Sequence, residues 1–501
     1  MSMRSNYLSE SVRRLIEEGG IDNAIIVENV IRPWTYVRAA IEGLEAATTG
    51  TQRMGGLSIG IITRNRPPHL ALIDATIALG HCYFALNPMF SDQDLANDIV
   101  GLGLHVMAAS HDDLERFEVW EAALRSGAAI IELTSGEAPL KFIRKCASDR
   151  DLPDRSGAAI AMLSSGTTGV PKRITLSYNN LASAIGQLVV KKPIGQPKLP
   201  AQLRPALIWH PIGHISGAVM AIEALSVGRP VILMERFDPH LWASLVERYE
   251  VRLGHVNPTA MRMILDANIE PSRLRSLRYI RGGTTATPSE LQEEFERRYQ
   301  VPFMTTYGAT EFAGAVASWS PEDYRRYGKT HAGSSGRPHA DVQLRTVNPA
   351  DAHVLAAGEE GILEVLTPQA ANGNGNWVRT TDLAVIDDEG FLWITGRMDD
   401  VITRGGFKIH PAKIERAFKD HPAVFDVAVV GLDDARLGAV PVAAVVLREN
   451  FEATTTEDLL VFVKGVLARY EVPTRVVIVD TLPLTLSMKV SRPALRALFA
   501  Q

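Results

Sequence analysis

The sequence predicts an α/β protein with a large N-terminal domain of stacked, mainly parallel sheets flanked by helices, followed by a small mobile α+β domain. Short β-rich runs alternate with helical patterns from residue 9 to about residue 150 and again in the middle of the chain, which is typical of parallel sheets covered by helices. After residue 396 the pattern changes to short helices and long β-runs. With 501 residues, 46% of them hydrophobic, the chain is long enough for several large cores.

Residues 57–109 predict three strands with a helix between each pair. The strands are Leu57–Ile62, Cys82–Leu86 and Val106–Ala109. Pro68 is suited to the first turn of the first helix, and Gly80 follows its end. Ser91 is suited to cap the second helix, which places Leu95 and Ile99 on one face. We therefore expect parallel pairing of the three strands.

Further strands are expected in the middle of the chain, with a helix at Pro288–Tyr299. They are Ala206–Trp209, Val231–Met234, Leu253–Val256, Tyr279–Arg281 and Phe303–Thr306. Polar or glycine-rich segments follow three of them, at 210–217, 282–284 and 306–311. Because ligands of open α/β sheets bind at the carboxyl ends of strands, these segments predict a binding site.

The C-terminal segment predicts a small α+β unit. A helix begins near Pro411, with Ile414, Ala417 and Phe418 on one face. A capping box of Thr454 and Glu457 begins a second helix. The predicted strands are Val424–Val430, Val440–Leu447 and Arg475–Val479.

A glycine- and hydroxyl-rich loop lies between two predicted strands, Ala158–Leu163 and Ile174–Leu176. The loop reads Ser164, Ser165, Gly166, Thr167, Thr168, Gly169, Val170, Pro171 and Lys172. Its glycines allow the backbone to approach a ligand closely, and its hydroxyls, N–H groups and lysine can bind phosphate oxygens. It is not a Walker A loop, because the spacing differs and a strand rather than a helix follows. On composition alone, a flexible surface loop is an equal alternative.

Charge and cysteine content exclude several classes of function. The net charge is −5 and no basic block occurs, which argues against a nucleic-acid partner. Cys82 and Cys146 lie far apart, so no disulfide framework or cysteine metal site is indicated. No apolar leader and no 18-residue apolar run occur, so we expect a cytoplasmic protein without a membrane span.

The phosphate loop, together with other motifs in the same order, resembles the acyl-adenylate-forming superfamily, which includes acyl-CoA synthetases, adenylation domains and luciferases. The matching motifs are Arg64–His69 with Leu86–Pro88, Pro211-x-x-His214-x-x-Gly217, Tyr307–Glu311, Thr381-Asp382, Gly396–Asp400, Arg404–Ile409 and Pro483–Lys489. Together they cover nearly the whole chain. The resemblance implies domains at 1–396 and 401–501 joined by a hinge at 397–400.

The resemblance also implies the reaction and its cofactors. A carboxylic acid would react with ATP and Mg²⁺ to give acyl-AMP and pyrophosphate, and the acyl group would then pass to the thiol of CoA. Its catalytic residues would be Lys489, His214 and Glu311, with Glu311 and Thr167 at the metal. Lys489 would contact the α-phosphate.

The remaining site residues are assigned by the same resemblance. ATP would be bound by Ser164, Ser165, Gly166, Thr167, Thr168, Gly169, Lys172, Gly283, Thr284, Thr306, Tyr307, Thr310, Asp382 and Arg397. The acyl pocket would be lined by His214, Ile215, Ser216, Val256, Gly283, Thr284 and Ala309. The hinge residue would be Asp399, and the loop of the thiol step would contain Gly405, Gly406 and Lys408.

Four positions depart from the family pattern. Arg173 and Met488 replace glycines beside the phosphate loop and the C-terminal lysine, Thr381 replaces the glycine of a Thr-Gly-Asp motif, and Ile362 replaces a glutamate. None of them removes a charged group that the implied mechanism needs. Their effects on efficiency and domain geometry stay open.

The substrate class is inferred from what the pocket lacks. No acidic residue occurs between Trp209 and Ala221, so the ammonium group of an α-amino acid would have no counter-charge. A fatty or aromatic acid fits better. Two alternatives to a CoA ligase are an enzyme that loads a separate carrier protein and a non-catalytic homologue. Monomer and homodimer both stay open.

His214 has three interpretations. It could bind zinc together with His210, it could pack as a structural histidine, or it could line the acyl pocket as the motif implies. The zinc interpretation requires a helix across Pro211 and Gly213, which both residues oppose. We therefore expect His214 at the pocket.

Overall fold

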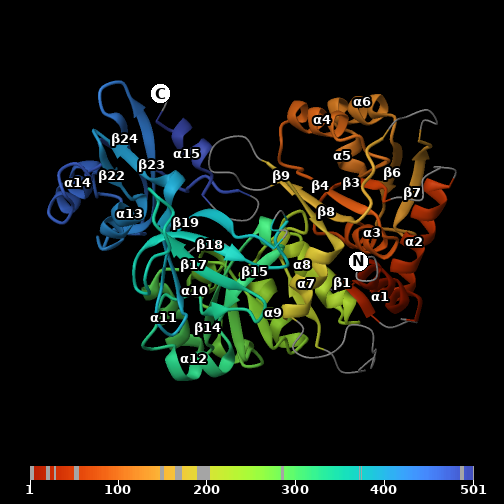
Figure 1. Ribbon diagram of the computed structural model, residues 1–501, viewed down its shortest axis with the longest axis horizontal. Helices are drawn as coiled ribbons and strands as arrows, with labels where there is room; N and C mark the ends of the chain where they lie inside the picture. The colour runs from red at the N-terminus through yellow and green to blue at the C-terminus, as the bar shows by residue number, and fades with distance from the viewer. Residues whose placement is uncertain are drawn as a thin grey trace. The chain divides into compact units, whose positions relative to one another are not determined.

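A computed structural model describes residues 5–18, 23–27, 30–49, 56–146, 152–163, 172–188, 204–283, 287–371, 373, 375–485 and 490–499. These residues form two compact units, which we describe separately (Figure 1). The first contains residues 5–163, 172–343 and 365–378, and the second contains 344–364 and 379–499. Since the second unit includes residues on both sides of the expected hinge, the domain boundary at 397–400 stays a prediction.

The N-terminal sheet of the first unit has the strand order β7-β6-β5-β3-β4-β8-β9. Its strands are β3 (Ser58–Ile62), β4 (Cys82–Leu86), β5 (Val106–Ser110), β6 (Ala129–Leu133), β7 (Leu140–Arg144), β8 (Ala158–Leu163) and β9 (Arg173–Ser177). The predicted parallel pairing of β3, β4 and β5 is confirmed, while β7 and β9 pair antiparallel.

Helices cover both faces of this sheet, as Figure 1 shows. They are α1 (Ser5–Glu18), α2 (Trp34–Thr48) and α3 (Pro67–Ala78) on one face, and α4 (Asp92–Gly101), α5 (His111–Leu114) and α6 (Phe117–Ser126) on the other. Successive strand residues point to opposite faces, so Ile61 joins the core under α1–α3 and Ile62 joins the core under α4 and α6. Both faces are therefore apolar, which explains the continuous hydrophobic runs in the sequence.

The middle of the chain forms two further sheets of the first unit. One has the order β10-β11-β1-β2 and the other β12-β13-β14-β15-β16. Their strands are β1 (Asn23–Val27), β2 (Val30–Pro33), β10 (Ala206–Ile208), β11 (Val231–Leu233), β12 (Leu253–His255), β13 (Tyr279–Gly282), β14 (Phe303–Ala309), β15 (Gly314–Ser318) and β16 (Arg337–Pro338). The accompanying helices are α7 (Tyr178–Leu188), α8 (Ile215–Ser226), α9 (Pro239–Arg248), α10 (Pro258–Asp266), η1 (Pro271–Leu274), α11 (Ser289–Tyr299), η2 (Thr310–Phe312) and α12 (Pro321–Tyr327). The five strands expected here all form.

The second unit contains two sheets, β17-β18-β19-β20 and β22-β21-β24-β23, with β25 beside β24. Its strands are β17 (Gln343–Val347), β18 (Gly361–Leu366), β19 (Val378–Ile386), β20 (Leu392–Arg397), β21 (Ile402–Arg404), β22 (Phe407–Ile409), β23 (Val424–Asp434), β24 (Gly438–Leu447) and β25 (Arg475–Ile478). Of these, β17, β18 and β19 each have one or more terminal residues in the first unit. The helices are η3 (Met398–Asp400), α13 (Pro411–Lys419), α14 (Thr456–Lys464) and α15 (Arg492–Ala497).

The predicted capping box of α14 is wrong by one residue. Thr455, not Thr454, accepts from the backbone of Asp458, and Asp458 accepts from the backbone of Thr455 in return. The predicted pair of Thr454 and Glu457 and the observed pair of Thr455 and Asp458 both have the required spacing of three. The buried positions of Leu459 and Val463 decide that the observed pair starts the helix. None of the helices in the described ranges is both long and apolar enough to span a bilayer.

Candidate active site

The segment that carries His214 is a turn between β10 and α8. His214 is the N-cap residue of α8: its N–H donates to the Pro211 carbonyl at 2.9 Å, and its carbonyl accepts from Ala218 at 3.0 Å. His210 and His214 therefore flank a turn instead of sharing a helix face, so the helical i, i+4 zinc arrangement does not form. A Cβ on Gly217 would lie 2.3 Å from the Pro211 carbonyl oxygen, which explains the glycine of this motif.

Asn65 holds this turn in place, a role that the sequence did not reveal. The side chain is 5% exposed, and its Nδ2 atom lies 3.2, 3.0 and 3.0 Å from the carbonyls of Trp209, His210 and Met234. Its Oδ1 atom accepts from Ile212 N–H at 2.9 Å. A buried amide can thus fix residues that lie more than a hundred positions away. The available signal was its position, since Asn65 follows a buried strand.

A second buried polar pair lies beside Asn65. Arg64 donates to both carboxylate oxygens of Asp113, at 2.8 and 2.7 Å, and Ser110 donates to the same carboxylate at 2.8 Å. The Asp113 side chain is fully buried. Burial alone would raise the pKa of Asp113, but the hydrogen bonds from Arg64 and Ser110 hold it below its ordinary value. This pair fixes the backbone at the carboxyl end of β3.

The predicted adenine and metal motif lies on β14 and η2. Thr306 donates to the Gly282 carbonyl at 3.1 Å, and a Cβ on Gly283 would lie 2.5 Å from the Thr306 hydroxyl. A Cβ on Gly308 would lie 2.1 Å from the Gly314 carbonyl of the neighbouring strand. The structure thus brings Thr306 together with Gly283, as expected, and both motif glycines are required by close packing.

Glu311 and its neighbours follow in η2. The Glu311 carbonyl accepts from Ala371 at 2.8 Å, which anchors the backbone, and the residue is partly exposed. Tyr307 and Thr310 are 8% and 9% exposed, and Glu311 supplies the carboxylate of this group. A carboxylate oxygen fits Mg²⁺, which prefers hard oxygen ligands.

The acyl-pocket residues belong to the same unit as Glu311. Ile215 and Val256 are 7% and 1% exposed, whereas Ser216 and Ala309 are partly exposed. The apolar members therefore pack in the wall and the small ones can face a ligand. This composition fits the expected pocket for an uncharged acyl group.

Asp382 and Arg397 face each other across the hairpin β19–β20 in the second unit. They are direct cross-strand partners, with 3.4 Å between Asp382 Oδ1 and Arg397 Nε, and their side chains are 18% and 38% exposed. Arg397 also donates to the Thr381 hydroxyl at 2.6 Å. Thr381, which replaces a family glycine, thus orients the arginine.

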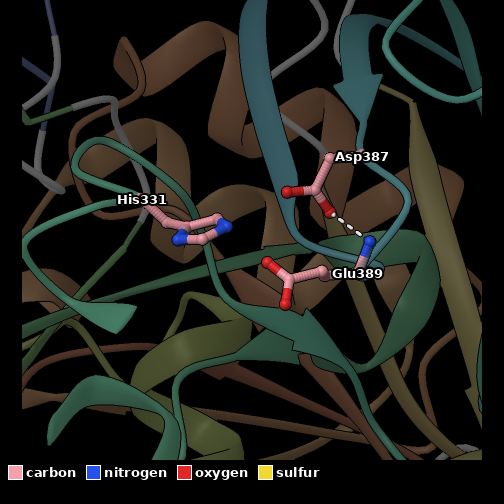
Figure 2. A group of neighbouring side chains, drawn as sticks. All are labelled: His331, Asp387 and Glu389. Atoms are coloured by element: carbon pink, nitrogen blue, oxygen red, sulfur yellow. Dashed lines mark hydrogen bonds between the residues drawn. The ribbon is translucent and has the colours of Figure 1, made fainter. Parts of the chain in front are cut away.

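The other end of this hairpin is a tight turn shown in Figure 2. Glu389 N–H donates to Asp387 Oδ1 at 3.0 Å, and Phe391 N–H donates to the same oxygen at 2.8 Å. Gly390 adopts a φ of 82°, which favours glycine. The turn sets the register as far as Ala384 opposite Ile394, and a one-residue shift between Leu383 and Ala384 then brings Asp382 opposite Arg397.

Gly405 and Gly406 form the two-residue turn between β21 and β22. Their φ values of 57° and 87° are those of a tight hairpin, so the turn itself requires glycine. Lys408 is exposed on β22, and Asp399 lies in η3. Their roles in the thiol step and the hinge stay predictions.

Two departures from the family pattern have structural explanations. Arg173 ion-pairs with Asp98 at 2.6 Å and donates to the carbonyls of Ala85 and Ala161 at 3.0 and 3.2 Å, so it joins β9 to α4 and the centre of the sheet. Ile362 is 6% exposed and packs against Val347 and Leu383 in a small apolar core.

Several predicted site residues lie outside the described residues. They are Ser164, Ser165, Gly166, Thr167, Thr168, Gly169, Thr284, Met488 and Lys489. Lys172, at the end of the phosphate loop, is described and exposed.

Known protein families and individual relatives match most of the chain. Residues 38–373 match the AMP-binding enzyme family, and residues 413–489 match the AMP-binding enzyme C-terminal domain. The chain is 29% identical to an indoleacetate–CoA ligase of Aromatoleum aromaticum over 94% of each chain. It is also 29% identical to a 2-succinylbenzoate–CoA ligase of Bacillus cereus, over 88% of this chain and 89% of that one.

Solved structures share the fold. ATP-bound MatB from Rhodopseudomonas palustris matches with a TM-score of 0.81 at 23% identity, covering 98% of this chain and 99% of that one. The o-succinylbenzoate CoA synthetase of Bacillus subtilis, in complex with its acyl-adenylate, matches with a TM-score of 0.77 at 24% identity, covering 97% and 98%. The family match extends over most of the chain, and the chain therefore belongs to the AMP-binding enzyme family.

Proposed function

We propose that the protein is an ATP-dependent acid–CoA ligase whose substrate is an aromatic carboxylic acid. The observation that carries this proposal is the pocket turn and the start of α8, residues 210–220, which contain two histidines and no carboxylate. A buried ammonium group would be left without a counter-charge there, which disfavours amino acids. The names of the indoleacetate and 2-succinylbenzoate ligases support an aromatic acid.

In the first half-reaction, a carboxylate oxygen of the acid attacks the α-phosphorus of ATP and pyrophosphate leaves. His214 would lie against the reacting carboxylate end, and Asp382 would accept hydrogen bonds from the ribose hydroxyls. Glu311, with Thr167, would hold Mg²⁺, which neutralises phosphate charge when bound. Arg397, which stays charged, would bind ribose or phosphate.

In the second half-reaction, the CoA thiol attacks the acyl carbon and AMP leaves with the bonding electrons. The Gly405–Gly406 hairpin would pass beside the pantetheine arm, with Lys408 on its exposed strand. Rotation at Asp399 would replace Lys489 by this hairpin between the two steps. Transfer to a carrier-protein thiol uses the same chemistry and is the second candidate.

The decisive experiment separates the half-reactions in Lys489→Ala. Acid-dependent release of pyrophosphate should fall by several orders of magnitude, because the lysine would contact the α-phosphate during adenylation. Thioester formation from supplied acyl-AMP and CoA should continue. Lys464→Ala, an exposed position on α14, is the matched control.

Three results would change the proposal. Equal loss of both half-reactions would remove Lys489 from the adenylation step. Faster transfer to a carrier protein than to CoA would establish the second candidate. If the wild-type protein released no pyrophosphate with any acid of a mixed aromatic and fatty panel, the ligase function itself would be rejected.

A further inference from the structure

Arg281 lies at the end of β13, close to the predicted acyl pocket. Its Cα partner on β12 is His255, and its carbonyl accepts from the N–H of the pocket residue Val256 at 3.1 Å. Tyr279, two positions earlier, shares its face of the strand, with the guanidinium 6.0 Å from the ring centre. The Arg281 side chain therefore lies on the same face of the sheet as that of His255.

The neighbours of the Arg281 guanidinium satisfy its hydrogen bonds and its positive charge only in part. Its Nε atom is buried and has no hydrogen-bond partner among the described residues. The carboxylate that interacts with it electrostatically is Glu223 on α8, and this carboxylate also lies near Arg229. Burial raises the pKa of Glu223, and the two arginines only partly oppose the rise. Glu223 thus shares its single carboxylate between two guanidinium groups.

Arg229 is already engaged in holding the backbone. It donates to the carbonyls of Arg204 and Pro205 at 2.7 and 3.2 Å. Arg281 has no such contacts with carbonyls in the described ranges. A guanidinium that is half-buried without a full set of hydrogen bonds is costly, and such groups are concentrated at binding sites.

Two histidines, His255 and His339, interact electrostatically with this cation without adding charge, and His210 lies next to His255. Burial, followed by the charge of Arg281, lowers the pKa of His255 well below its ordinary value and that of His339 to about 4. Burial, followed by His214, lowers the pKa of His210 to about 3. At neutral pH all three rings are uncharged, so each offers one donor and one acceptor.

His210 connects this cluster with the pocket turn. Its ring centre lies 6.5 Å from that of His255, and its Nδ1 atom is buried with no partner in the described part of the chain. The residue is only 7% exposed. His255 thus has as neighbours two residues, Arg281 and His210, that each carry a buried polar atom without a partner in the described residues, a pattern that a polar ligand group explains.

We propose that Arg281, His255 and His210 form a subsite for a second carboxylate of the acid substrate, remote from the carboxylate that is adenylated. The planar fork of arginine suits two-pronged binding of a carboxylate, and the neutral imidazoles donate the remaining hydrogen bonds. The α8 helix, which begins with the pocket residues Ile215 and Ser216, carries Glu223 on the same side. This inference rests on the proposed function and narrows it to aromatic dicarboxylic acids.

The test uses acid pairs that differ by one carboxylate. Suitable pairs are 3-benzoylpropionate with 2-succinylbenzoate and phenylacetate with 2-carboxyphenylacetate, with octanoate and octanedioate as an aliphatic pair. We expect the wild-type kcat/KM to favour the aromatic dicarboxylates by about 10- to 100-fold, the value of a charged hydrogen bond. Arg281→Leu should remove this preference by lowering only the dicarboxylate values.

Two further variants complete the design. Arg281→Lys keeps the charge but loses the two-pronged geometry, so we expect an intermediate preference and a folded protein. Arg278→Leu, three residues earlier and exposed, should change nothing. If Arg281→Leu does not fold, the wild-type preference and the Arg281→Lys variant still decide whether the carboxylate subsite exists.

The outcomes separate this inference from the proposed function. Equal wild-type activity on both members of each pair, or an equal loss on both in Arg281→Leu, would overturn the subsite while leaving the ligase intact. No pyrophosphate release with any acid would reject the ligase first. A preference for dicarboxylates that Arg281→Lys leaves unchanged would also overturn the role of the guanidinium fork.

Discussion

The region of the first unit that we propose binds the acid and the hairpin of the second that we propose binds the nucleotide are built on different principles. Asn65 and Asp113 are buried and bonded at 2.7 to 3.2 Å, and they connect segments far apart in the sequence. Asp382 and Arg397 are partly exposed neighbours on one hairpin and lie 3.4 Å apart. The first region is fixed by its buried hydrogen bonds, whereas the second leaves its charged groups accessible.

This difference fits what each region would bind. A pocket that discriminates among acids needs walls that do not rearrange, because specificity comes from fixed shape and fixed polar groups. Ribose and phosphate groups are recognised by charge and hydrogen bonding at a surface that must open to release product. Substitutions in the first region should therefore act on stability, and those in the second on ATP affinity.

The largest expected effect is that of Asp113→Asn, which removes a fully buried carboxylate that pairs with the partly exposed Arg64. We expect a loss of about 3 kcal/mol in the free energy of unfolding at pH 7. The exposed neighbour in Asp112→Asn should cost less than about 0.5 kcal/mol. Urea unfolding measures both, and equal losses would contradict the contrast between buried and exposed charges.

The same variant predicts a pH dependence. The pKa of folded Asp113 is lower than that of the unfolded chain, so its pairing stabilises the protein fully above the unfolded value and is lost as pH falls through the folded value. The stability difference between wild type and Asp113→Asn should therefore shrink below about pH 4. A difference that stays constant into acid would show that the pair contributes through packing alone.

The next effect is that of Asn65→Leu, which removes the bonds to the 209–212 turn and leaves buried carbonyls unpaired. We expect a loss of about 2 to 3 kcal/mol, together with a higher KM for the acid. Asn97→Ala, on the exposed face of α4, serves as control and should change neither quantity. Loss of stability with an unchanged KM would show that the turn does not position the acid.

A smaller effect is expected in the second region. Asp382→Asn should raise the KM for ATP about tenfold, because the neutral amide accepts weaker hydrogen bonds from the ribose hydroxyls. Stability in urea should change by less than about 0.5 kcal/mol, since the pair with Arg397 is partly exposed. Asp388→Asn, in the exposed turn of the same hairpin, should leave the KM for ATP unchanged. A large loss of stability in Asp382→Asn would contradict the difference that we propose between the two regions.

The smallest effect tests whether burial, and not membership of a unit, decides the outcome. Ser91 caps α4 in the first unit, accepting from Asp94 N–H at 3.1 Å, and is exposed. Ser91→Ala should cost about 1 kcal/mol, and Ser91→Asn should retain most of that stability. Neither should alter the KM for the acid. A cost as large as that of Asn65→Leu would show that position in the first unit matters more than burial.

Local patterns in the sequence were sufficient for the strands and for the family. Short, continuous β-rich runs gave β3, β4, β5 and the strands of the middle region to within three residues, because strands buried on both faces are apolar at successive positions. The ordered motifs gave the family, since each needs only its own few residues. The prediction of the capping box of α14 was wrong by one residue because each of two adjacent threonines has a suitable acidic partner three residues later.

Tertiary structure alone decided how these elements combine. The sequence did not show that β10 and β11 join β1 and β2 while β12, β13 and β14 form another sheet, because strand pairing depends on packing between distant segments. Nor did it show that Asn65 bonds to Trp209, that Asp113 bonds to Arg64, or that the Nε atom of Arg281 is buried without a hydrogen-bond partner in the described residues. A single polar residue has the same local pattern whether it is solvated or buried, and only the fold determines which distant groups surround it.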